Sequence, residues 1–237
     1  MDRSRRRRVA IVAIAAIVAA TCIALSFWQL QRLADRRTRN AAIERERSRD
    51  PVLITTAAGG EVEPYIPVRA SGTFDAEREV LVYGRSLGGE PGHLVVTPMV
   101  LDDGTAVLVI RGWVPFDHQT VPVADAAPPA GELSIHGFLV SDEGDGSTVP
   151  DESGVIGRLD VEGIGSTLPY PVLALAIRQT EQAPPQPSEL PIPLPQEELS
   201  EGPHLSYAIQ WFCFAAIAVV GAVILLRRER RSPRAAP

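Results

Sequence analysis

The sequence predicts a membrane protein in which two transmembrane helices flank a β-rich exported domain. Two uncharged runs of twenty residues lie near the ends of the 237-residue chain, at Val9–Trp28 and Tyr207–Leu226. A helix rises about 1.5 Å per residue, so each run is about as long as the hydrocarbon core of a bilayer is thick. Between the runs, short apolar stretches alternate with Gly, Pro and Asp, a pattern typical of strands joined by turns.

The distribution of arginine predicts the orientation of the chain. The tails at residues 1–8 and 227–237 carry five arginines each, and the positive-inside rule places such tails in the cytoplasm. Two spans return the chain to the side on which it started, so the middle is exported. We therefore expect a multi-pass protein of the cell (inner) membrane, with both termini cytoplasmic and the central domain extracytoplasmic.

A cleaved signal peptide is the alternative for the first apolar run, because a basic start followed by apolar residues describes both. The run is longer than the about 7 to 15 apolar residues of a signal peptide, and no small-x-small cleavage site occurs at Ser26–Leu30. We expect a retained transmembrane helix over residues 9–30. A helical extension over residues 31–50 should follow and end before Pro51, because proline disfavours helical geometry in the preceding residue.

The exported domain is predicted over residues 51–183, with seven short strands. These are residues 66–73, 79–84, 93–101, 106–113, 132–140, 155–159 and 172–178. The turn at Asp102–Gly104 should join two of them as an antiparallel hairpin. Helical patterns are scarce, which favours a small barrel or sandwich over a layered α/β structure. A proline-rich spacer over residues 184–203 then leads to the second transmembrane helix at 204–226.

The amino-acid composition limits which partners can bind this domain and how its fold can be stabilised. The segment Pro51–Ser206 carries 23 acidic residues and six arginines, which argues against nucleic acid as a partner. Cys22 and Cys213 both lie in the predicted spans, so the exported domain must be stabilised by its core without a disulfide. All 23 basic residues are arginine, a bias that favours a GC-rich bacterial source.

Four segments, taken together, carry a family resemblance. They are FWQLQR (Phe27–Arg32), GTFDAEREVLVYGRS (Gly72–Ser86), GHLVVTPMVLDDGTAVLVIRGWVP (Gly92–Pro115) and GPHLSYAIQWF (Gly202–Phe212). In this order, and with a span at each end, they resemble the surfeit locus protein 1 family of cytochrome c oxidase assembly factors. Residues 116–201 add little to the resemblance apart from VIGRLDV.

The resemblance implies a non-enzymatic membrane assembly factor for haem-copper cytochrome c oxidase, one that assists haem a delivery or insertion into the catalytic subunit. The implied partners are that subunit, haem a synthase and the lipid bilayer. The alternative is a membrane scaffold that binds no haem and stabilises an oxidase assembly intermediate. Two other classes are poorly supported: copper(I) needs sulfur ligands, and the exported part offers only Met99, while an exported hydrolase lacks a G-x-S-x-G elbow.

The candidate cofactor-binding residues lie at the exported ends of the two spans. His204, Tyr207 and Trp211 share one helical face, and Trp28 should lie at a similar depth in the first span. Imidazole can ligate haem iron and aromatic rings can cover a porphyrin, and the resemblance assigns the role of iron ligand for a transient haem a to His204. Trp and Tyr are also ordinary anchors at a membrane interface, so both interpretations stay open.

Three further predictions concern the contacts of two glutamines, of one arginine and of a set of small residues. Gln29 and Gln210 should either bond to each other across the helices or reach interfacial water. Arg111 could hold a haem propionate, but an ion pair in so acidic a domain is favoured. Close approach of the helices is expected from small residues four apart, namely Ala15, Ala19, Ala218 and Ala222.

Overall fold

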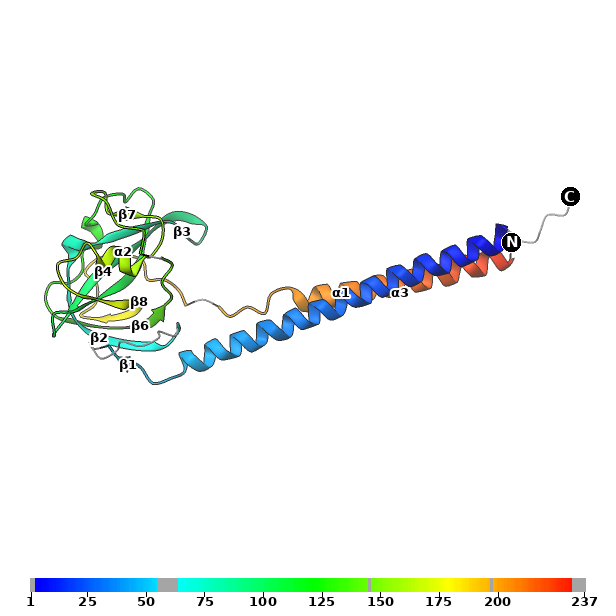
Figure 1. Ribbon diagram of the computed structural model, residues 1–237, viewed down its shortest axis with the longest axis horizontal. Helices are drawn as coiled ribbons and strands as arrows, with labels where there is room; N and C mark the ends of the chain where they lie inside the picture. The colour runs from blue at the N-terminus through cyan, green and yellow to red at the C-terminus, as the bar shows by residue number, and fades with distance from the viewer. Residues whose placement is uncertain (1–2, 55–63, 145, 197, 232–237) are drawn as a thin grey trace. The chain divides into compact units, whose positions relative to one another are not determined.

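The computed structural model describes residues 3–54, 64–144, 146–196 and 198–231. The chain divides into two compact units. One consists of Met1–Ala42 with Glu198–Pro237, and the other of Ile43–Glu197. The first unit holds the long helices and the second holds the sheet (Figure 1).

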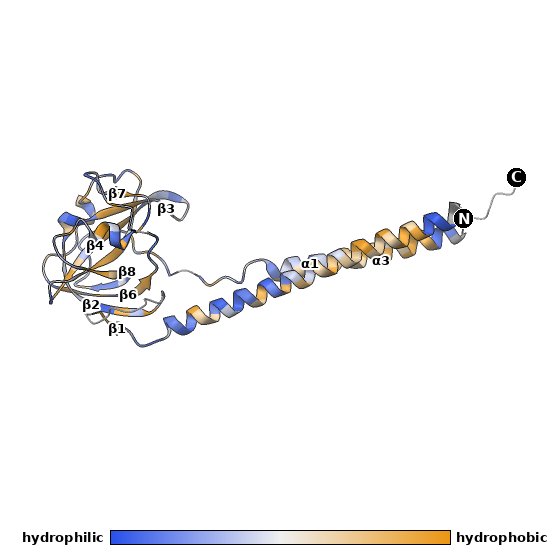
Figure 2. Cartoon of the chain, viewed as in Figure 1, coloured by the Kyte–Doolittle hydropathy of each residue, from blue (hydrophilic) through white to orange (hydrophobic). Residues whose placement is uncertain are grey.

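The first unit is a pair of helices that lie side by side (Figure 1). They are α1 (Arg3–Arg47), whose last five residues are counted with the second unit, and α3 (His204–Arg231). Both are long and apolar enough to cross a membrane. Figure 2 shows the apolar stretch in each of them, with hydrophilic residues at the start of α1. The helices run antiparallel, because Arg8 of α1 bonds to Glu229 near the end of α3 and Phe27 packs edge-on against Phe212. The predicted first span and its extension form one unbroken helix.

The contact between the helices follows a heptad-like spacing. Buried positions are separated by three, four or seven residues, at Ala19, Cys22, Ser26 and Leu33 of α1 and at Ala208 and Ala215 of α3. This period of about 3.5 residues keeps one stripe facing the partner as the helices wind around each other. The Ser26 hydroxyl donates to the Cys22 carbonyl at 3.0 Å, so its polar group is satisfied inside the seam. We call this stripe the helix seam.

The second unit contains one mixed sheet in the order β1-β2-β6-β8-β5-β4-β3-β7. Its strands are β1 (Val52–Leu53), β2 (Pro67–Phe74), β3 (Val80–Leu87), β4 (Glu90–Leu101), β5 (Ala106–Pro115), β6 (Leu133–Val140), β7 (Val155–Ile156) and β8 (Val172–Ala183). Each of the seven predicted strands overlaps a strand of the structure, although the one predicted over 155–159 is only the two residues of β7. Strand β1, the short helix α2 (Val161–Gly165) and the single turns η1 (Ala76–Arg78) and η2 (Ala124–Ala126) were not predicted.

An additional pairing of β2 with β4 closes five strands, β2, β6, β8, β5 and β4, into a barrel. The closure depends on Gly72, which is paired with both Leu133 of β6 and Leu101 of β4. A Cβ at this position would lie 2.2 Å from the carbonyl oxygen of Val100, so only glycine allows the two strands to meet. Of the two forms predicted, barrel or sandwich, the structure shows the barrel.

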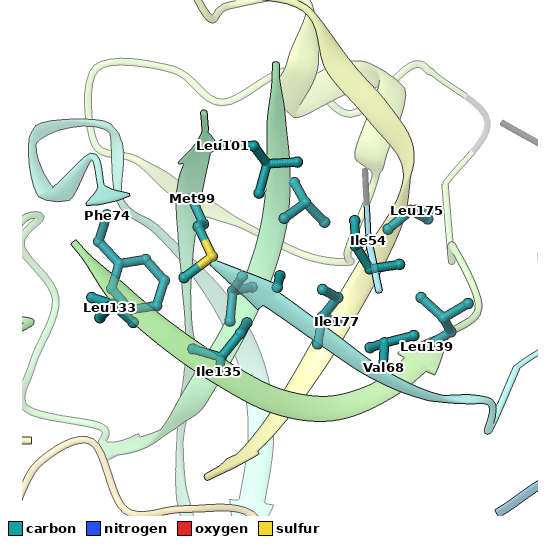
Figure 3. Packing of buried hydrophobic residues seen from close by; sticks show 13 residues of the cluster. Ile54, Val68, Phe74, Met99, Leu101, Leu133, Ile135, Leu139, Leu175 and Ile177 are labelled. Carbon is teal, nitrogen blue, oxygen red and sulfur yellow. The ribbon is translucent and has the colours of Figure 1, made fainter. Parts of the chain in front are cut away.

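Apolar side chains fill the barrel and also cover part of its outside. Figure 3 shows the interior cluster, which includes Phe74, Met99 and Ile177. A second cluster packs Leu108 of β5 against Ile164 of α2 on the opposite face. Strand β5 is therefore buried on both faces, which explains the apolar run of its first five residues, 106–110.

The proline-rich segment after β8 is attached to the barrel along part of its length. Ile192 and Trp113 exchange two backbone hydrogen bonds of 2.8 Å, while Leu190 and Leu194 pack against the outer clusters. Gly112 makes this approach possible, because a Cβ there would lie 2.5 Å from the Ile192 carbonyl oxygen. The segment is therefore attached to the domain at least as far as Leu194.

Candidate functional site

His204 is the first residue of α3 and meets α1 at Gln29. The Nδ1 atom of its ring lies 2.9 Å from the amide oxygen of Gln29, and both side chains are half-buried. Gln210, the other glutamine considered as a partner for Gln29, is exposed. Of the two interpretations left open for the glutamines, the bond between them is not formed: Gln29 contacts His204 instead, and Gln210 is exposed.

The space beside the other ring nitrogen of His204 is bounded by Gly202. This glycine has φ +70°, which favours glycine over other residues. A Cβ at position 202 would lie 3.5 Å from Cδ2 and 3.6 Å from Nε2 of the imidazole. Within the described part of the chain, Nε2 has no hydrogen-bond partner. One nitrogen of the ring is held by Gln29, and the other has no partner among the described residues.

This arrangement fits a haem ligand better than a site for a bare metal ion. In the ranges that the structure describes, no three His, Cys, Asp or Glu side chains converge on a common point. A haem iron would need fewer groups from the protein, because the porphyrin supplies most of its ligands and one imidazole could hold it. His204 is the residue whose Nε2 atom could supply such a ligand.

The chain just before α3 is held against α1 by side chains of the helical extension. The Arg37 guanidinium donates two hydrogen bonds of 2.8 Å to the Glu201 carboxylate. These hydrogen bonds lower the pKa of Glu201, so the pair is charged at neutral pH. Two further donors reach backbone carbonyls, Arg36 to Ser200 and Asn40 to Leu199. Together these contacts fix where α3 starts, and so where His204 lies.

The three aromatic candidates lie in surroundings that differ from those of His204. Trp211 packs into the helix seam against Ala19, Cys22 and Ala215. Tyr207 and Trp28 are each 47% exposed, and the guanidinium of Arg32 lies 5.5 Å from the centre of the Trp28 ring. Among the described residues, no ring contact joins any two of His204, Tyr207, Trp211 and Trp28.

Arg111 forms the ion pair that the sequence favoured. Its Nη1 atom lies 3.2 Å from Glu79, and the two side chains are 0% and 1% exposed. Thr97 and the backbone N–H of Val123 also donate to this carboxylate, at 3.0 and 2.8 Å. Burial raises the pKa of Glu79, and these donors oppose the rise. A propionate could not reach Arg111 without breaking this network.

The sequence did not identify two residues of the site. Gln29 was noted as polar, but its partner was not predicted, and Gly202 was noted only within a segment of the resemblance. The spacing of small residues contained a usable signal, because the heptad that includes Ala15 and Cys22 continues to position 29 and turns that side chain toward α3.

Comparison with known proteins gives matches along most of the chain. A model of the SURF1 family matches residues 16–216. A SURF1-like protein of Rickettsia felis is 26% identical over 211 residues, which cover 86% of this chain and 92% of the relative. A SURF1-like protein of Monosiga brevicollis is 29% identical over 231 residues, covering 90% and 87%. The cytochrome oxidase assembly protein SHY1 of Saccharomyces cerevisiae is 33% identical over 94 residues, covering 38% of this chain and 24% of the yeast protein.

Proposed function

The chain belongs to the SURF1 family, and from that premise we propose that it is a membrane assembly factor for haem-copper cytochrome c oxidase. In this role it assists the delivery of haem a to the catalytic subunit and performs no catalytic step of its own. The yeast relative that is named a cytochrome oxidase assembly protein supports the assembly role. The haem a synthase is the natural donor and the oxidase catalytic subunit the acceptor.

The observation that carries the haem part of the proposal is the environment of His204. Its Nδ1 atom is held by Gln29, while Nε2 lies beside Gly202 and has no hydrogen-bond partner among the described residues. Bound haem a would supply an iron that accepts one more nitrogen ligand. The contribution of the chain is a single positioned imidazole, and one ligand suits a protein that must release its cargo again.

The membrane arrangement is proposed from the two apolar helices and the arginines at their ends. Both helices span the bilayer, the arginine-rich tails lie in the cytoplasm, and the barrel lies outside. His204 and Gln29 are then at the outer surface of the membrane. An amphipathic macrocycle such as haem a would be accommodated at that depth.

One observation favours the scaffold alternative. Trp211 is packed in the helix seam, and Trp28 and Tyr207 point outward without contacting each other. The four candidates therefore form no aromatic enclosure. A helix pair that presents exposed aromatic side chains at the membrane surface could instead bind the helices of an oxidase subunit.

The test is to purify the full chain from cells that make haem a and to record its absorbance spectrum. We expect haem in the wild type and in the control His118→Ala, and at least about a tenfold loss in His204→Ala, because the iron ligand is removed. A wild-type protein without haem would overturn the delivery role.

Deletion of the gene separates the carrier from the scaffold. Loss of a carrier should leave oxidase catalytic subunit that lacks haem a. Loss of a scaffold should lower the amount of the subunit while the remaining enzyme has its normal haem content. A fully loaded and normally abundant oxidase would contradict both roles.

A further inference from the structure

We propose that Gln29 is a positioning residue that holds His204 in the Nδ1–H tautomer and thereby leaves Nε2 as the atom that binds haem iron. The first part concerns the protonation of one ring and stands on geometry alone. The second part rests on the proposed function of His204.

The orientation of the Gln29 amide favours one tautomer of His204. The Gln29 amide oxygen lies 2.9 Å from Nδ1 of His204. An amide oxygen can only accept, so with the oxygen of Gln29 facing the ring the proton of the contact belongs to Nδ1. In a neutral imidazole with Nδ1 protonated, the lone pair available to a metal is on Nε2.

The position of Gln29 on α1 explains why its amide is fixed. The residues three before and four after it, Ser26 and Leu33, are 0% and 5% exposed in the helix seam. Gln29 is thus on the stripe that faces α3, where burying an unpaired amide would cost about 1 to 3 kcal/mol. Pairing with His204 removes that cost and restrains both side chains.

The partner is fixed from the other side by the loop that precedes it. Arg37 holds Glu201 and Asn40 holds the Leu199 carbonyl, so the start of α3 is tied to α1 on both sides of Ser200. Gly202, which has no side chain, lies beside the Nε2 edge of the ring. Metal-binding histidines are generally oriented in this way, by a hydrogen bond from the ring nitrogen that does not touch the metal.

The chain supplies a matched control in Gln210. It is the same residue type, it lies on α3 within two turns of His204, and it is exposed. No hydrogen bond of its side chain occurs among the residues that the structure describes. A substitution of Gln210 changes the polarity at the same depth in the membrane as Gln29, but it does not affect the imidazole of His204.

The first experiment measures the tautomer directly. Nitrogen NMR of the full chain, labelled at histidine and reconstituted without haem, distinguishes a protonated from an unprotonated ring nitrogen. His204→Ala identifies the signals. We expect His204 to be Nδ1–H in the wild type and in Gln210→Leu, and to shift toward Nε2–H in Gln29→Leu. An Nε2–H ring in the wild type, or no change in Gln29→Leu, would overturn the proposal.

The second experiment measures haem retention in the same variants. Gln29→Leu should retain about 10- to 100-fold less haem, the usual effect of losing such a supporting partner. Gln29→Glu, which keeps an acceptor at the same distance, should restore retention and shows that the fold is intact. If wild type and Gln29→Leu bind haem equally, Gln29 has no positioning role and the proposed function still stands. If the wild type binds no haem, the second part of the proposal fails together with the delivery role.

Discussion

Glu79 joins four parts of the barrel domain through one buried carboxylate. It precedes β3, accepts from Thr97 of β4 and Arg111 of β5, and receives the backbone N–H of Val123 in the following loop. The Arg111 side chain also lies over the Phe74 ring at 5.3 Å. Because all of these groups are buried, each depends on the others for compensation of its lost hydration.

Removal of Glu79 should be strongly destabilising. Glu79→Ala leaves Arg111 charged and buried without a partner, and we expect a loss of about 3 to 5 kcal/mol in the free energy of unfolding. Chemical denaturation of the full chain followed by tryptophan fluorescence measures it, with the exposed Glu77→Ala as control. The double variant Glu79→Leu with Arg111→Met should recover most of the loss. Equal effects of Glu79→Ala and Glu77→Ala would contradict the role of the pair.

Tyr170 makes the stability of the domain depend on pH at the alkaline end. Its hydroxyl donates to Asp75 at 2.8 Å. Burial, followed by this contact with Asp75, raises the pKa of Tyr170 above its ordinary value. A raised folded-state pKa contributes stability that is complete below the unfolded value, about pH 10, and is lost as the pH rises through the folded value.

The expected result is a pH-dependent difference between wild type and Tyr170→Phe. Below pH 10 the wild type should be more stable by about 1 kcal/mol, the usual worth of one hydrogen bond. The difference should shrink above pH 10. Denaturation at neutral and alkaline pH gives both values, and a difference that stays constant or grows would refute this assignment.

At the scale of residues, the sequence indicated His204 as a candidate but did not predict its contact with Gln29. Gln29 and Gln210 look alike in a linear sequence, since both are polar residues near the exported end of an apolar run. Only the register of two packed helices separates them, and that register is set by the positions of small residues on both helices together. Gly202 could not be assigned, because its effect depends on where the ring of His204 lies.

At the scale of elements, strands were predictable wherever side chains alternate or form an apolar run. Strand β8 extends to Ala183, beyond its predicted end, because its last residues are polar and owe their extended form to pairing with Ser134–His136 of β6. The five-residue helix α2 contains two glycines and shows no helical pattern. The pairing of strands that are distant in the sequence depends on the whole sheet. The sequence alone therefore did not decide between a barrel and a sandwich.

The addition of one methyl group at Gly72 should destabilise the closed barrel. Gly72→Ala places a Cβ against the Val100 carbonyl, and we expect a loss of about 1 to 3 kcal/mol from overpacking. Gly157→Ala is the matched control, because its Cβ would meet the Tyr83 ring at 3.3 Å or more, where the side chain can yield. Thermal unfolding measures the loss of stability in both variants. Similar midpoints would argue that β2 and β4 are not tightly joined.

At the scale of the whole molecule, the two units differ in charge and hydropathy. The arginine-rich tails belong to the helical unit, and the acidic excess belongs largely to the barrel unit. Neither cysteine is in the barrel, and both are free. Each unit is thus stabilised by its own means, the helices by a narrow seam and the barrel by a closed core.

The proposed membrane orientation can be measured with single thiols. With Cys22 and Cys213 replaced by alanine, Glu132→Cys in the barrel domain should react with a membrane-impermeant maleimide in intact cells. Ser232→Cys in the C-terminal tail should react only after the cells are opened. Labelling of the tail from outside, or protection of position 132, would exclude an exported domain between two spans.

The place of β8 in the sheet has a consequence for biosynthesis. This strand is the last to be made, yet it lies between β6 and β5 in the finished sheet. While translation proceeds, both neighbours therefore present bare edges that invite pairing with other chains. Only residues 184–203 separate β8 from the second apolar helix, so the domain completes itself late, when most of the polypeptide has already left the ribosome. A premature stop before Val172 should yield a fragment that aggregates or is degraded.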